Sequence, residues 1–533
     1  MPKRPDIDIR PDHWEIVRSL LGKHVPQYAV WAFGSRAKWI AKDYSDLDLA
    51  VITDKPLTLS VSSSLSDDFS ESDLPWKVDV VDWATTSDSF RKIILEEYVV
   101  VQVSARGRNR AMSAEWQDTT IGAVCSKVFS GGTPTSTNPD YYGGAIPWLR
   151  TKEVKYGKIF DTEQHITQLG LENSSAKFVP INSVIVAMYG NGDTAGRVAI
   201  NKIPLATNQA CCNLVINPAR ADFRFVYYYL MGRYQELVDL KNGGAQQNLN
   251  GQLIKAFPFA APDIDEQSAI ADVFESLDDR ITLLRETNAT LEAIAQALFK
   301  SWFVDFDPVR AKLEGRAPEG MDDATAALFP DGFEESELGL VPRGWRVKPL
   351  DEVANFLNGL ALQKFPPTDD AWLPVIKIAQ LRKGDTVGAD RAGRNLKPEY
   401  IIQNGDVLFS WSGSLEVEVW CGGEGALNQH LFKVTSDNYP KWFYYLWTKH
   451  HLEYFRQIAA SKATTMGHIQ RAHLTQAKVV APPDAFVEAV GESFAPLLDR
   501  WIATALQAQT LATLRDTLLP RLISGQLRLP EVS

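Results

Sequence analysis

The sequence predicts a multidomain α+β protein in which a small α/β domain precedes two related α+β globules and two long helices. A chain of 533 residues is too long for one hydrophobic core, so several domains are expected. The second observation is an internal repeat, and the third is a pair of long helical patterns, one in each copy of that repeat.

The composition is that of an ordinary globular protein, with 45% hydrophobic and 10% aromatic residues. No apolar run approaches the roughly 18 residues of a membrane span, and the N-terminus lacks a signal-peptide core, so we expect a cytoplasmic protein without a membrane partner. The four cysteines form no Cys-x-x-Cys pair and no cluster with histidine, which favours reduced core thiols over a metal site: Cys125, Cys211, Cys212 and Cys421.

The net charge of −11 would argue against a nucleic-acid partner if it were spread evenly along the chain, but it is concentrated in one region. Residues 263–342 hold 19 acidic and 6 basic residues, which is more than the whole acidic excess. Residues 343–482 hold 17 basic and 13 acidic residues, and residues 111–262 hold 13 basic and 11 acidic residues. Because local fields decide association, the global charge does not exclude DNA binding.

The repeat begins near Glu115, and its second copy follows about 220 to 229 residues later. The matching pairs include EWQDTTIGAV and GWRVKPLDEV (from Glu115 and Gly344), INSVIVAMYGNG and QNGDVLFSWSGS (Ile181 and Gln403), TNQACCNLVI and LNQHLFKVT (Thr207 and Leu427), FVYYYL and WFYYLW (Phe225 and Trp442), LDDRITLL and LLDRWIAT (Leu277 and Leu497), and ATLEAIAQALF and QTLATLRDTLL (Ala289 and Gln509). Two tandem copies of one unit therefore occupy about 115–533.

Each copy consists of short β-like runs broken by Gly, Pro and Asn, followed by a helical stripe of about 30 residues. A helix of that length spans roughly 45 Å at 1.5 Å per residue, and its simplest partner is the matching helix of the other copy, as an antiparallel coiled coil. Two separate helical hairpins are the alternative. The expected domains are a front domain (1–110), a first globule (115–262), a central helical spacer with an acidic linker (263–342), a second globule (343–482) and a C-terminal helical spacer (483–533). Two related globules held apart by long helices suit the reading of two DNA half-sites at a fixed spacing.

Polar, Gly-rich stretches of the two globules supply candidate DNA contacts. Arg suits guanine in the major groove, and Gln or Asn suits adenine. The candidates are Arg150, Lys152, Arg197, Gln246, Gln247 and Asn248 in the first globule, and Lys377, Lys462, Thr464, Thr465 and His468 in the second. For any one of them, a solvated loop or a phosphate contact is the competing interpretation.

The front domain combines a Gly34-Ser35 turn with carboxylates on two predicted strands. YAVWAF is expected to form a strand that ends at the turn, and LDLAVI a second strand, on which alternation places Asp46 and Asp48 on one face about 7 Å apart. KVDVVDW, a third strand, adds Asp79. Such carboxylates suit Mg²⁺ together with substrate phosphates, and backbone N–H groups at the turn suit a triphosphate. Metal ions there would neutralise charge in phosphoryl or nucleotidyl transfer.

The amino-acid sequence of the repeat region resembles that of the DNA specificity subunits of type I restriction–modification systems. The resemblance lies in SWFVDFDPVRAKLEGRAPEG from Ser301, GGTPTSTNPDYYGGAIPWLRTKEV from Gly131 and the C-terminal LRDTLLPRLISGQLRL, and it covers nearly four-fifths of the chain. It implies two target-recognition domains that read a bipartite sequence in double-stranded DNA. It also implies helical spacers that dock methyltransferase subunits. We expect two such subunits, and a translocase/nuclease subunit that joins later. No P-loop is present, and no adenine-methyltransferase signature, so this region is expected to be non-catalytic and to need no cofactor.

The front segment resembles the minimal nucleotidyltransferase domain of the polymerase β superfamily, in its Gly-Ser turn, Asp-x-Asp and later Asp. The resemblance implies that Gly34 and Ser35 bind nucleotide phosphates and that Asp46, Asp48 and Asp79 are the catalytic metal ligands, for Mg²⁺ and an NTP. Asp82 is the less favoured third carboxylate because it falls later on its strand. A domain kept for protein contact, or a different metal-dependent activity, stays open. The alternative function for the whole chain is a nucleotidyltransferase that modifies a protein or RNA and is localised by the DNA-reading part.

Overall fold

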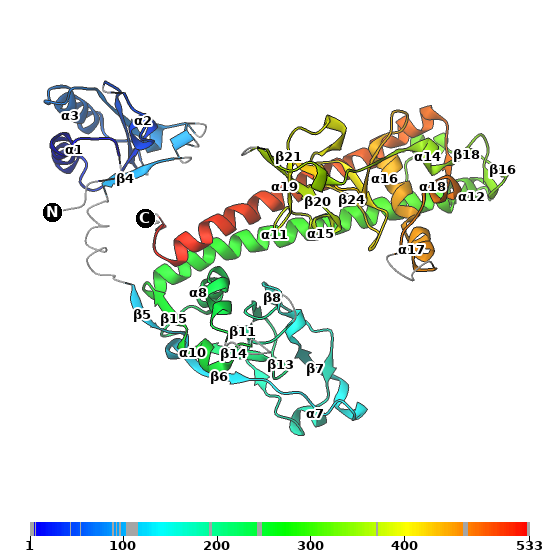
Figure 1. The fold of residues 1–533 in the computed structure, drawn as a ribbon, viewed down its shortest axis with the longest axis horizontal. Helices are drawn as coiled ribbons and strands as arrows, with labels where there is room; N and C mark the ends of the chain where they lie inside the picture. The colour runs from blue at the N-terminus through cyan, green and yellow to red at the C-terminus, as the bar shows by residue number, and fades with distance from the viewer. Residues whose placement is uncertain are drawn as a thin grey trace. The chain divides into compact units, whose positions relative to one another are not determined.

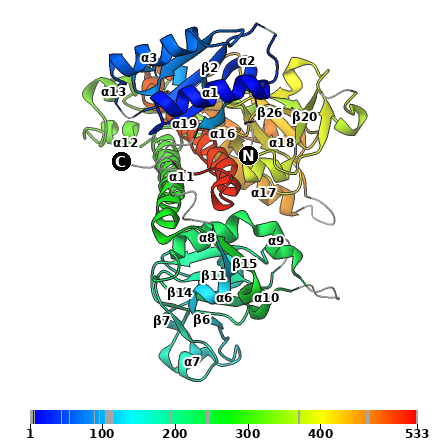
Figure 2. The ribbon, with the colours of Figure 1, turned by 90° about the vertical axis from the view of Figure 1, so that its left-hand side faces the viewer.

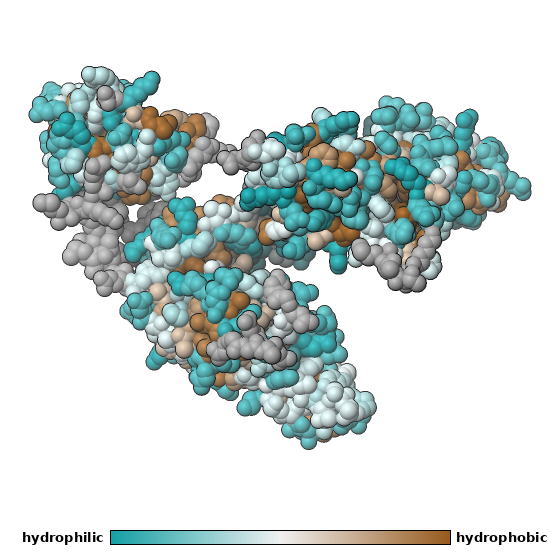
Figure 3. Space-filling model, viewed as in Figure 1, coloured by the Kyte–Doolittle hydropathy of each residue, from teal (hydrophilic) through white to brown (hydrophobic). Residues whose placement is uncertain are grey.

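The computed structural model describes residues 5–529 except 6, 43, 54, 88–89, 92, 95–96, 103–115, 191–193, 242–247, 369–370 and 462–466 (Figure 1). The chain divides into two compact units, the first made of residues 1–129, 214–222 and 249–267, and the second of the remainder. In the described part of the chain, no helix is both long and apolar enough to cross a membrane. Hydrophilic residues cover most of the face seen in Figure 3, and apolar residues show there in small patches.

The N-terminal domain, residues 5–102, is built on a four-stranded sheet in the order β3-β2-β1-β4. Its elements are α1 (Pro11–His24), β1 (Ala29–Phe33), α2 (Gly34–Ala37), β2 (Leu47–Ile52), α3 (Leu59–Ser70), β3 (Val78–Asp82) and β4 (Val99–Gln102). Strand β1 is antiparallel to β2 and β4, whereas β2 and β3 are parallel. The parallel pair needs a crossover connection, and α3 provides it.

Alternation along the strands separates two faces of this sheet. One face packs under α1 and α3, which lie side by side in Figures 1 and 2, and Leu49 of β2 and Leu65 of α3 are buried there. The opposite face carries a smaller cluster around Phe33 and Ala50. Asp48 lies between Leu47 and Leu49 in the strand, so it belongs to the second face.

The first unit also contains a pair of strands from distant parts of the chain. Strand β5 (Gln117–Thr120) pairs antiparallel with β15 (Pro258–Ala261). The short helix α6 (Ile121–Val124), which follows β5, packs against α10 (Gly251–Ala256). Segments about 140 residues apart in sequence are thereby brought together.

The body of the first globule contains two sheets, in the orders β10-β13-β7-β9 and β6-β14-β11-β12-β8. The strands are β6 (Cys125–Ser130), β7 (Tyr142–Leu149), β8 (Lys158–Ile159), β9 (His165–Ile166), β10 (Phe178–Val179), β11 (Val184–Ala187), β12 (Val198–Asn201), β13 (Leu205–Thr207) and β14 (Cys211–Ile216). The helices are α7 (Gln168–Glu172), α8 (Phe223–Gly232) and α9 (Tyr234–Asp239).

The second globule repeats this plan, with sheets in the orders β19-β26-β23-β24 and β21-β20-β25-β22 and a pair β18-β27. Its strands are β18 (Arg346–Pro349), β19 (Asn355–Asn358), β20 (Trp372–Ile376), β21 (Arg391–Gly393), β22 (Ile401–Ile402), β23 (Val407–Ser410), β24 (Val417–Val419), β25 (Gly425–Leu427), β26 (Leu431–Thr435) and β27 (Lys478–Ala481), and its helices are α14 (Leu350–Val353), α15 (Ile378–Lys383), α16 (Lys441–His450), α17 (Leu452–Ser461) and α18 (Arg471–Gln476). The parallel pair β7·β13 of the first globule corresponds to the parallel pair β20·β25 of the second, and the antiparallel pair β11·β12 to β23·β24.

Two long helices, α11 (Ile264–Phe299) and α19 (Asp484–Ile523), lie side by side and antiparallel (Figure 1). Asn288 of α11 donates from Nδ2 to the carbonyl oxygen of Trp501, at 3.1 Å. Ten residues earlier in α11, Asp278 pairs with Arg515 of α19. Positions that descend along one helix meet positions that ascend along the other, so the predicted antiparallel coiled coil is confirmed.

Residues 300–342, which carry much of the acidic excess, include a π-helical turn (Lys300–Val304), α12 (Asp307–Leu313), α13 (Asp323–Leu328) and the hairpin β16 (Phe333–Ser336) and β17 (Gly339–Pro342). Their apolar side chains join an aromatic core with α19. Trp302 meets Phe494 edge-on, with ring centroids 5.4 Å apart, and Phe329 meets Phe486 in the same way at 4.9 Å.

Candidate functional site

The parallel pairing of β2 and β3 brings two of the predicted carboxylates together. Asp48 and Asp79 are directly opposite each other in the register of the two strands. On the other edge of β2, Asp48 is opposite Phe33, the last residue of β1. Asp46 precedes β2 and is exposed, whereas Asp48 is half-buried. The sheet register therefore aligns Asp48 with Asp79, and the chain direction places Asp46 just ahead of them.

Gly34 lies directly against this pair. Its φ is +74°, in the left-handed region where a side chain is strained, and a Cβ at this position would collide with Oδ2 of Asp48. Ser35 follows it in the single turn of α2. Gly34 and the Asp48 carboxylate are thus in direct proximity.

The electrostatics of the cluster favour a cation. Burial, and then the neighbouring carboxylates of Asp79 and Asp46, raise the pKa of Asp48 above its usual value, while the Lys77 ammonium opposes that rise. Lys77 forms an ion pair with Asp79, and this contact raises the pKa of Lys77. A positive group already lies against the third carboxylate.

These residues fit the divalent cation that such a site would take. Carboxylate oxygens are the ligands that Mg²⁺ prefers, and the mutual repulsion of Asp46, Asp48 and Asp79 would be relieved by it. Among the residues with a described placement, no three acidic, His or Cys side chains are already arranged around one point as metal ligands. Lys77 contacts Oδ1 of Asp79, so Oδ2 of that carboxylate is the oxygen that could bind a cation while the ion pair persists.

Arg36 joins the segments that carry these groups, although the sequence interpretation did not single it out. Its guanidinium is buried, donates from Nε to the carbonyl oxygen of Ser45 at 2.9 Å and from Nη1 to that of Asp8 at 2.9 Å, and lies 4.3 Å from the ring centre of Trp76. Ser45 immediately precedes Asp46, and Trp76 lies three residues before Asp79. Arg36 therefore fixes the loop before β2 relative to the start of β3.

Asp82, the less favoured third carboxylate, has a structural role here. Its side chain accepts hydrogen bonds from the hydroxyl of Thr53 and from the backbone N–H groups of Leu57 and Ala84. In the strand register it lies opposite Val51, three residues beyond Asp48. These bonds hold the ends of β2 and β3 together.

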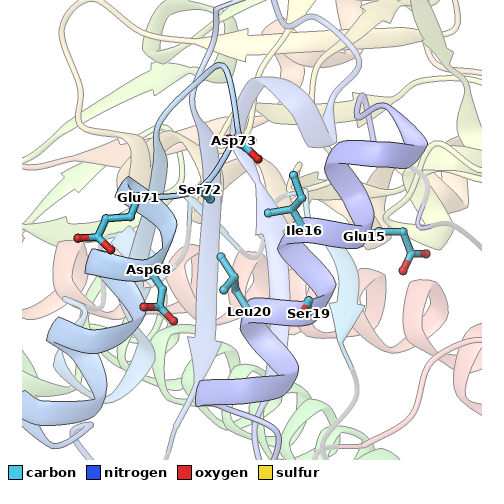
Figure 4. Close-up of a pocket in the computed structure, with 8 residues that line it drawn as sticks. All are labelled: Glu15, Ile16, Ser19, Leu20, Asp68, Glu71, Ser72 and Asp73. Atoms are coloured by element: carbon cyan, nitrogen blue, oxygen red, sulfur yellow. The ribbon is translucent and has the colours of Figure 1, made fainter.

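A hollow of about 480 Å³ lies elsewhere in this domain, between α1 and α3 (Figure 4). Ile16 and Leu20 of α1 face it, whereas the side chains of Glu15 and Glu71 point away from it. Its lining residues are Glu15, Ile16, Ser19, Leu20, Asp68, Glu71, Ser72 and Asp73. None of the predicted nucleotide or metal ligands is among them.

The predicted DNA contacts of the first globule are mostly engaged within the protein. Arg150 donates to Glu163 at 2.8 Å, and Lys152 pairs with the same carboxylate. The guanidinium of Arg197 lies 6.0 Å from the ring centre of Tyr156. Asn248 is half-buried, and Gln246 and Gln247 lie outside the described residues.

In the second globule, Lys377 pairs with Asp390, whereas His468 is exposed. Lys462, Thr464 and Thr465 lie outside the described residues. His468 forms an isolated β-bridge with Ser412, and its ring centre is 6.4 Å from that of Trp411. Of the candidates whose placement is described, His468 is the one that belongs to a surface cluster of polar and aromatic side chains.

The sequence interpretation missed the other members of that cluster and their counterparts in the first globule. They are Asn358, Trp411, Ser412, Gln429 and His430 in the second globule, and Thr133 and Gln209 in the first. A signal was present, because the Asn-Gln dipeptide is identical in the aligned segments TNQACCNLVI and LNQHLFKVT.

Comparison with known proteins identifies both parts of the chain. Residues 113–293 and 342–507 match the type I restriction modification DNA specificity domain, and residues 16–105 match the polymerase beta nucleotidyltransferase domain. The specificity subunit of the type I restriction enzyme MjaIX from Methanocaldococcus jannaschii is 26% identical over 451 residues, covering 78% of this chain and 98% of that protein. The probable protein adenylyltransferase MntA of Haemophilus influenzae is 55% identical over 96 residues, covering 18% of this chain and 84% of that protein.

Among solved structures, the type I restriction–modification S subunit from M. genitalium shares 16% identity and covers 79% of this chain and 97% of its own, with a TM-score of 0.44. That value is too low to add to the assignment. The two matches to the specificity domain together cover more than half of the chain. The chain therefore belongs to the family of type I restriction–modification DNA specificity proteins, and its front part is a nucleotidyltransferase domain of the MntA kind.

Proposed function

We propose that this protein is the DNA specificity subunit of a type I restriction–modification complex and reads a bipartite target in double-stranded DNA. The observation that carries the proposal is the duplicated globule, in which the same strand pairings recur and each copy is followed in the chain by one helix of an antiparallel pair. A bipartite sequence needs two readers, and a shared topology with different side chains supplies them. Residues 115–262 and 343–482 are the two target-recognition domains.

The helices, with the folded segment 300–342, are the docking region for partner proteins. Acidic residues dominate the sequence of 263–342, so this region would repel DNA phosphates and suits protein partners instead. Methyltransferase subunits, two in our proposal, bind here, and a translocase/nuclease subunit joins the complex.

Co-expression with the methyltransferase subunit, followed by methylome sequencing, tests this function. The expected result is adenine methylation at one interrupted, two-part motif. A methylome with no new motif, or with unsplit motifs alone, would contradict the proposal.

A second function, in the N-terminal domain, is favoured by the alignment of Asp48 with Asp79 beside Gly34. The domain transfers a nucleotide to a protein, and its relative MntA is named as a probable protein adenylyltransferase. In this proposal Gly34 and Ser35 bind the triphosphate and Asp46, Asp48 and Asp79 hold Mg²⁺, which would neutralise charge on the reacting phosphate. The oxygen of an acceptor hydroxyl attacks the α-phosphorus and its proton passes to water, while the bond from the α-phosphorus to the bridging oxygen breaks and releases pyrophosphate.

Label transfer from each of the four NTPs, with Mg²⁺ or Mn²⁺, to proteins of the host extract tests this activity. Asp46→Ala and Asp48→Ala should abolish transfer, whereas Asp67→Ala, an exposed carboxylate of α3, should not. Absence of transfer with all four nucleotides, or transfer that survives Asp48→Ala, would refute it.

A further inference from the structure

We propose that one turn in each globule reads the edge of a base, with Gln209 reading one half of the target and Gln429 the other. The Asn-Gln turn is defined here as Asn208–Gln209 in the first globule and Asn428–Gln429 in the second. The inference rests on the proposed DNA-specificity function, and it names the residues that would set the sequence.

In the first globule, the Asn-Gln turn joins β13 to β14 and is bound to the strand end at Gly131. Gly131 donates from its backbone N–H to the carbonyl oxygen of Cys211 at 3.3 Å, and Gly132 donates to that of Thr207 at 2.8 Å. A Cβ at Gly131 would collide with the backbone of Thr207 and Asn208. Only glycine permits so close an approach of the two chains.

In the second globule, the turn joins β25 to β26 and is held by the corresponding bonds. Gly359 donates to the carbonyl oxygen of Leu431 at 3.1 Å, and Leu360 donates to that of Leu427 at 2.9 Å. A Cβ at Gly359 would collide with the backbone of Leu427 and Asn428. The same glycine therefore supports the same turn in both copies.

In each globule, a third chain segment is hydrogen-bonded to the residue that follows the Asn-Gln turn. After β11, the backbone N–H of Met188 donates to the carbonyl oxygen of Ala210 at 2.8 Å. After β23, the backbone N–H of Trp411 donates to that of His430 at 3.3 Å. Each turn thus has a backbone frame of three segments, which holds the glutamine in a defined place.

The side chains mounted on this shared frame differ between the copies. Gln209 is exposed, and the hydroxyl of Thr133 donates to its Oε1. Gln429 donates from Nε2 to Nε2 of His430 at 3.3 Å, and His430 then donates from Nδ1 to Oγ of Ser412 at 3.0 Å. The tautomer of His430 follows from this chain of bonds, because a neutral imidazole that accepts at one nitrogen donates at the other.

These bonds orient each glutamine without consuming its capacity for base readout. Within the described part of the globule, the bond to His430 leaves Gln429 with its Oε1 and a second N–H. The bond from Thr133 leaves Gln209 with both N–H groups and a lone pair on Oε1. One N–H and one carbonyl lone pair match N7 and the N6 amino group of adenine in the major groove. Adenine is therefore the base that both turns suit.

In the second globule, further polar and aromatic side chains lie near the Asn-Gln turn. Trp411 donates from Nε1 to Oδ1 of Asn358, an exposed side chain, at 2.9 Å. Exposed His468 lies beside Trp411, and Arg471 donates to the carbonyl oxygen of Phe356, two residues before Asn358. A common frame with different neighbours predicts that the two half-targets share an adenine and differ at adjacent positions.

The test is methylome sequencing of cells that express the full chain with its methyltransferase subunit. Gln429→Ala should relax one adenine to any base in one half of the motif, and Gln209→Ala should do so in the other half. Methylation at the relaxed sites, relative to the original motif, should rise about tenfold to a hundredfold, as expected for the loss of one bidentate contact. His430→Ala should relax the same half as Gln429→Ala.

Exposed glutamines outside the turns provide matched controls. Gln168→Ala, on α7, and Gln403→Ala, before β23, should leave both halves of the motif unchanged. An unchanged motif with both turn variants would overturn the inference, as would weaker methylation at an unchanged motif, which indicates a phosphate contact. Failure of the wild-type chain to direct any bipartite motif would instead refute the proposed function itself.

Discussion

Arg515 connects the two long helices through a pair that the second copy of the repeat lacks. Its Nη1 lies 2.7 Å from Oδ1 of Asp278, and the hydroxyl of Tyr228 donates to Oδ2 of the same carboxylate at 2.9 Å. In the aligned repeat, the matching positions hold Ala295 for Arg515, Leu498 for Asp278 and Tyr445 for Tyr228, and these three residues line one small cavity. At the matching location, Leu498 and Ala295 thus replace the ion pair, and the Tyr445 hydroxyl instead accepts a hydrogen bond from Nζ of Lys449 at 3.2 Å.

Arg515→Ala leaves the Asp278 carboxylate with Tyr228 as its remaining partner among the contacts described here. Loss of one partner costs about 3–5 kcal/mol in a fully buried pair and about 0–1 kcal/mol in an exposed pair. The side chains of Arg515 and Asp278 are 18% and 21% exposed, so we expect a loss near 2–3 kcal/mol. The triple variant Tyr228→Phe/Asp278→Leu/Arg515→Ala takes Leu and Ala from the matching positions and removes the Tyr228 hydroxyl, which would otherwise lose its partner. It should lie within about 1 kcal/mol of the wild type.

Hydrogen exchange of peptides from α11 and α19 measures this effect locally, which is appropriate because a chain of several domains does not unfold in one step. Exchange in both helices should accelerate about 30- to 150-fold in Arg515→Ala and return near wild type in the triple variant. An Arg515→Ala chain that exchanges within threefold of wild type would show that the pair contributes little. A triple variant as fast as the single one would refute the matching of the two copies.

Three further predictions concern the N-terminal site and the second globule. Gly34→Ala should abolish label transfer from NTP while leaving DNA specificity unchanged, because its Cβ would collide with Asp48; retained transfer would contradict the assigned role of this turn. Arg36→Gln should lower kcat more than it raises the KM for NTP, because the loop at Ser45 loses the hydrogen bond from Arg36. Arg36→Lys should recover part of the rate. Equal changes in kcat and KM would indicate general unfolding. Burial depresses the pKa of His451 to about 4, so the stability contributed by its neutral form is fully present above pH 6.5 and is lost progressively as the pH falls toward 4. The loss should reach about 2 kcal/mol at pH 5. It is measured by hydrogen exchange as the local opening free energy of α16 peptides in wild type and in His451→Asn, which should lack the loss. Parallel pH profiles of the two proteins would rule out this histidine as the cause.

The front domain illustrates how much local pattern determines. Apolar alternation and turn residues predicted strands close to the observed β1, β2 and β3. The apolar residues Leu57, Val61, Leu65 and Phe69 recur every four residues, a helical spacing that agrees with α3. The choice of Asp79 over Asp82 also followed from position along the strand. The register that sets Asp79 opposite Asp48 did not, because strand pairing depends on contacts between segments about 30 residues apart.

For the candidate DNA contacts, by contrast, local sequence pattern predicted little. Arg150 and Lys152 are basic residues in a polar loop, yet Glu163, more than ten residues away, engages both of them. Gln209 and Gln429 have nothing in their immediate sequence to mark them, apart from the repeated dipeptide. Their importance arises from a glycine some 70 residues earlier that brings another strand end against the turn.

The sequence by itself determined the duplicated plan, the two long helices and the residue types of the proposed nucleotide site, since these depend on periodicity and on order along the chain. The tertiary structure decided which charged side chains are neutralised by neighbours, which carboxylates are aligned, and which polar groups are held outward on a rigid frame. The physical reason is that hydrogen bonds and ion pairs form over about 3 Å, and only the folded chain brings residues distant in sequence within that range.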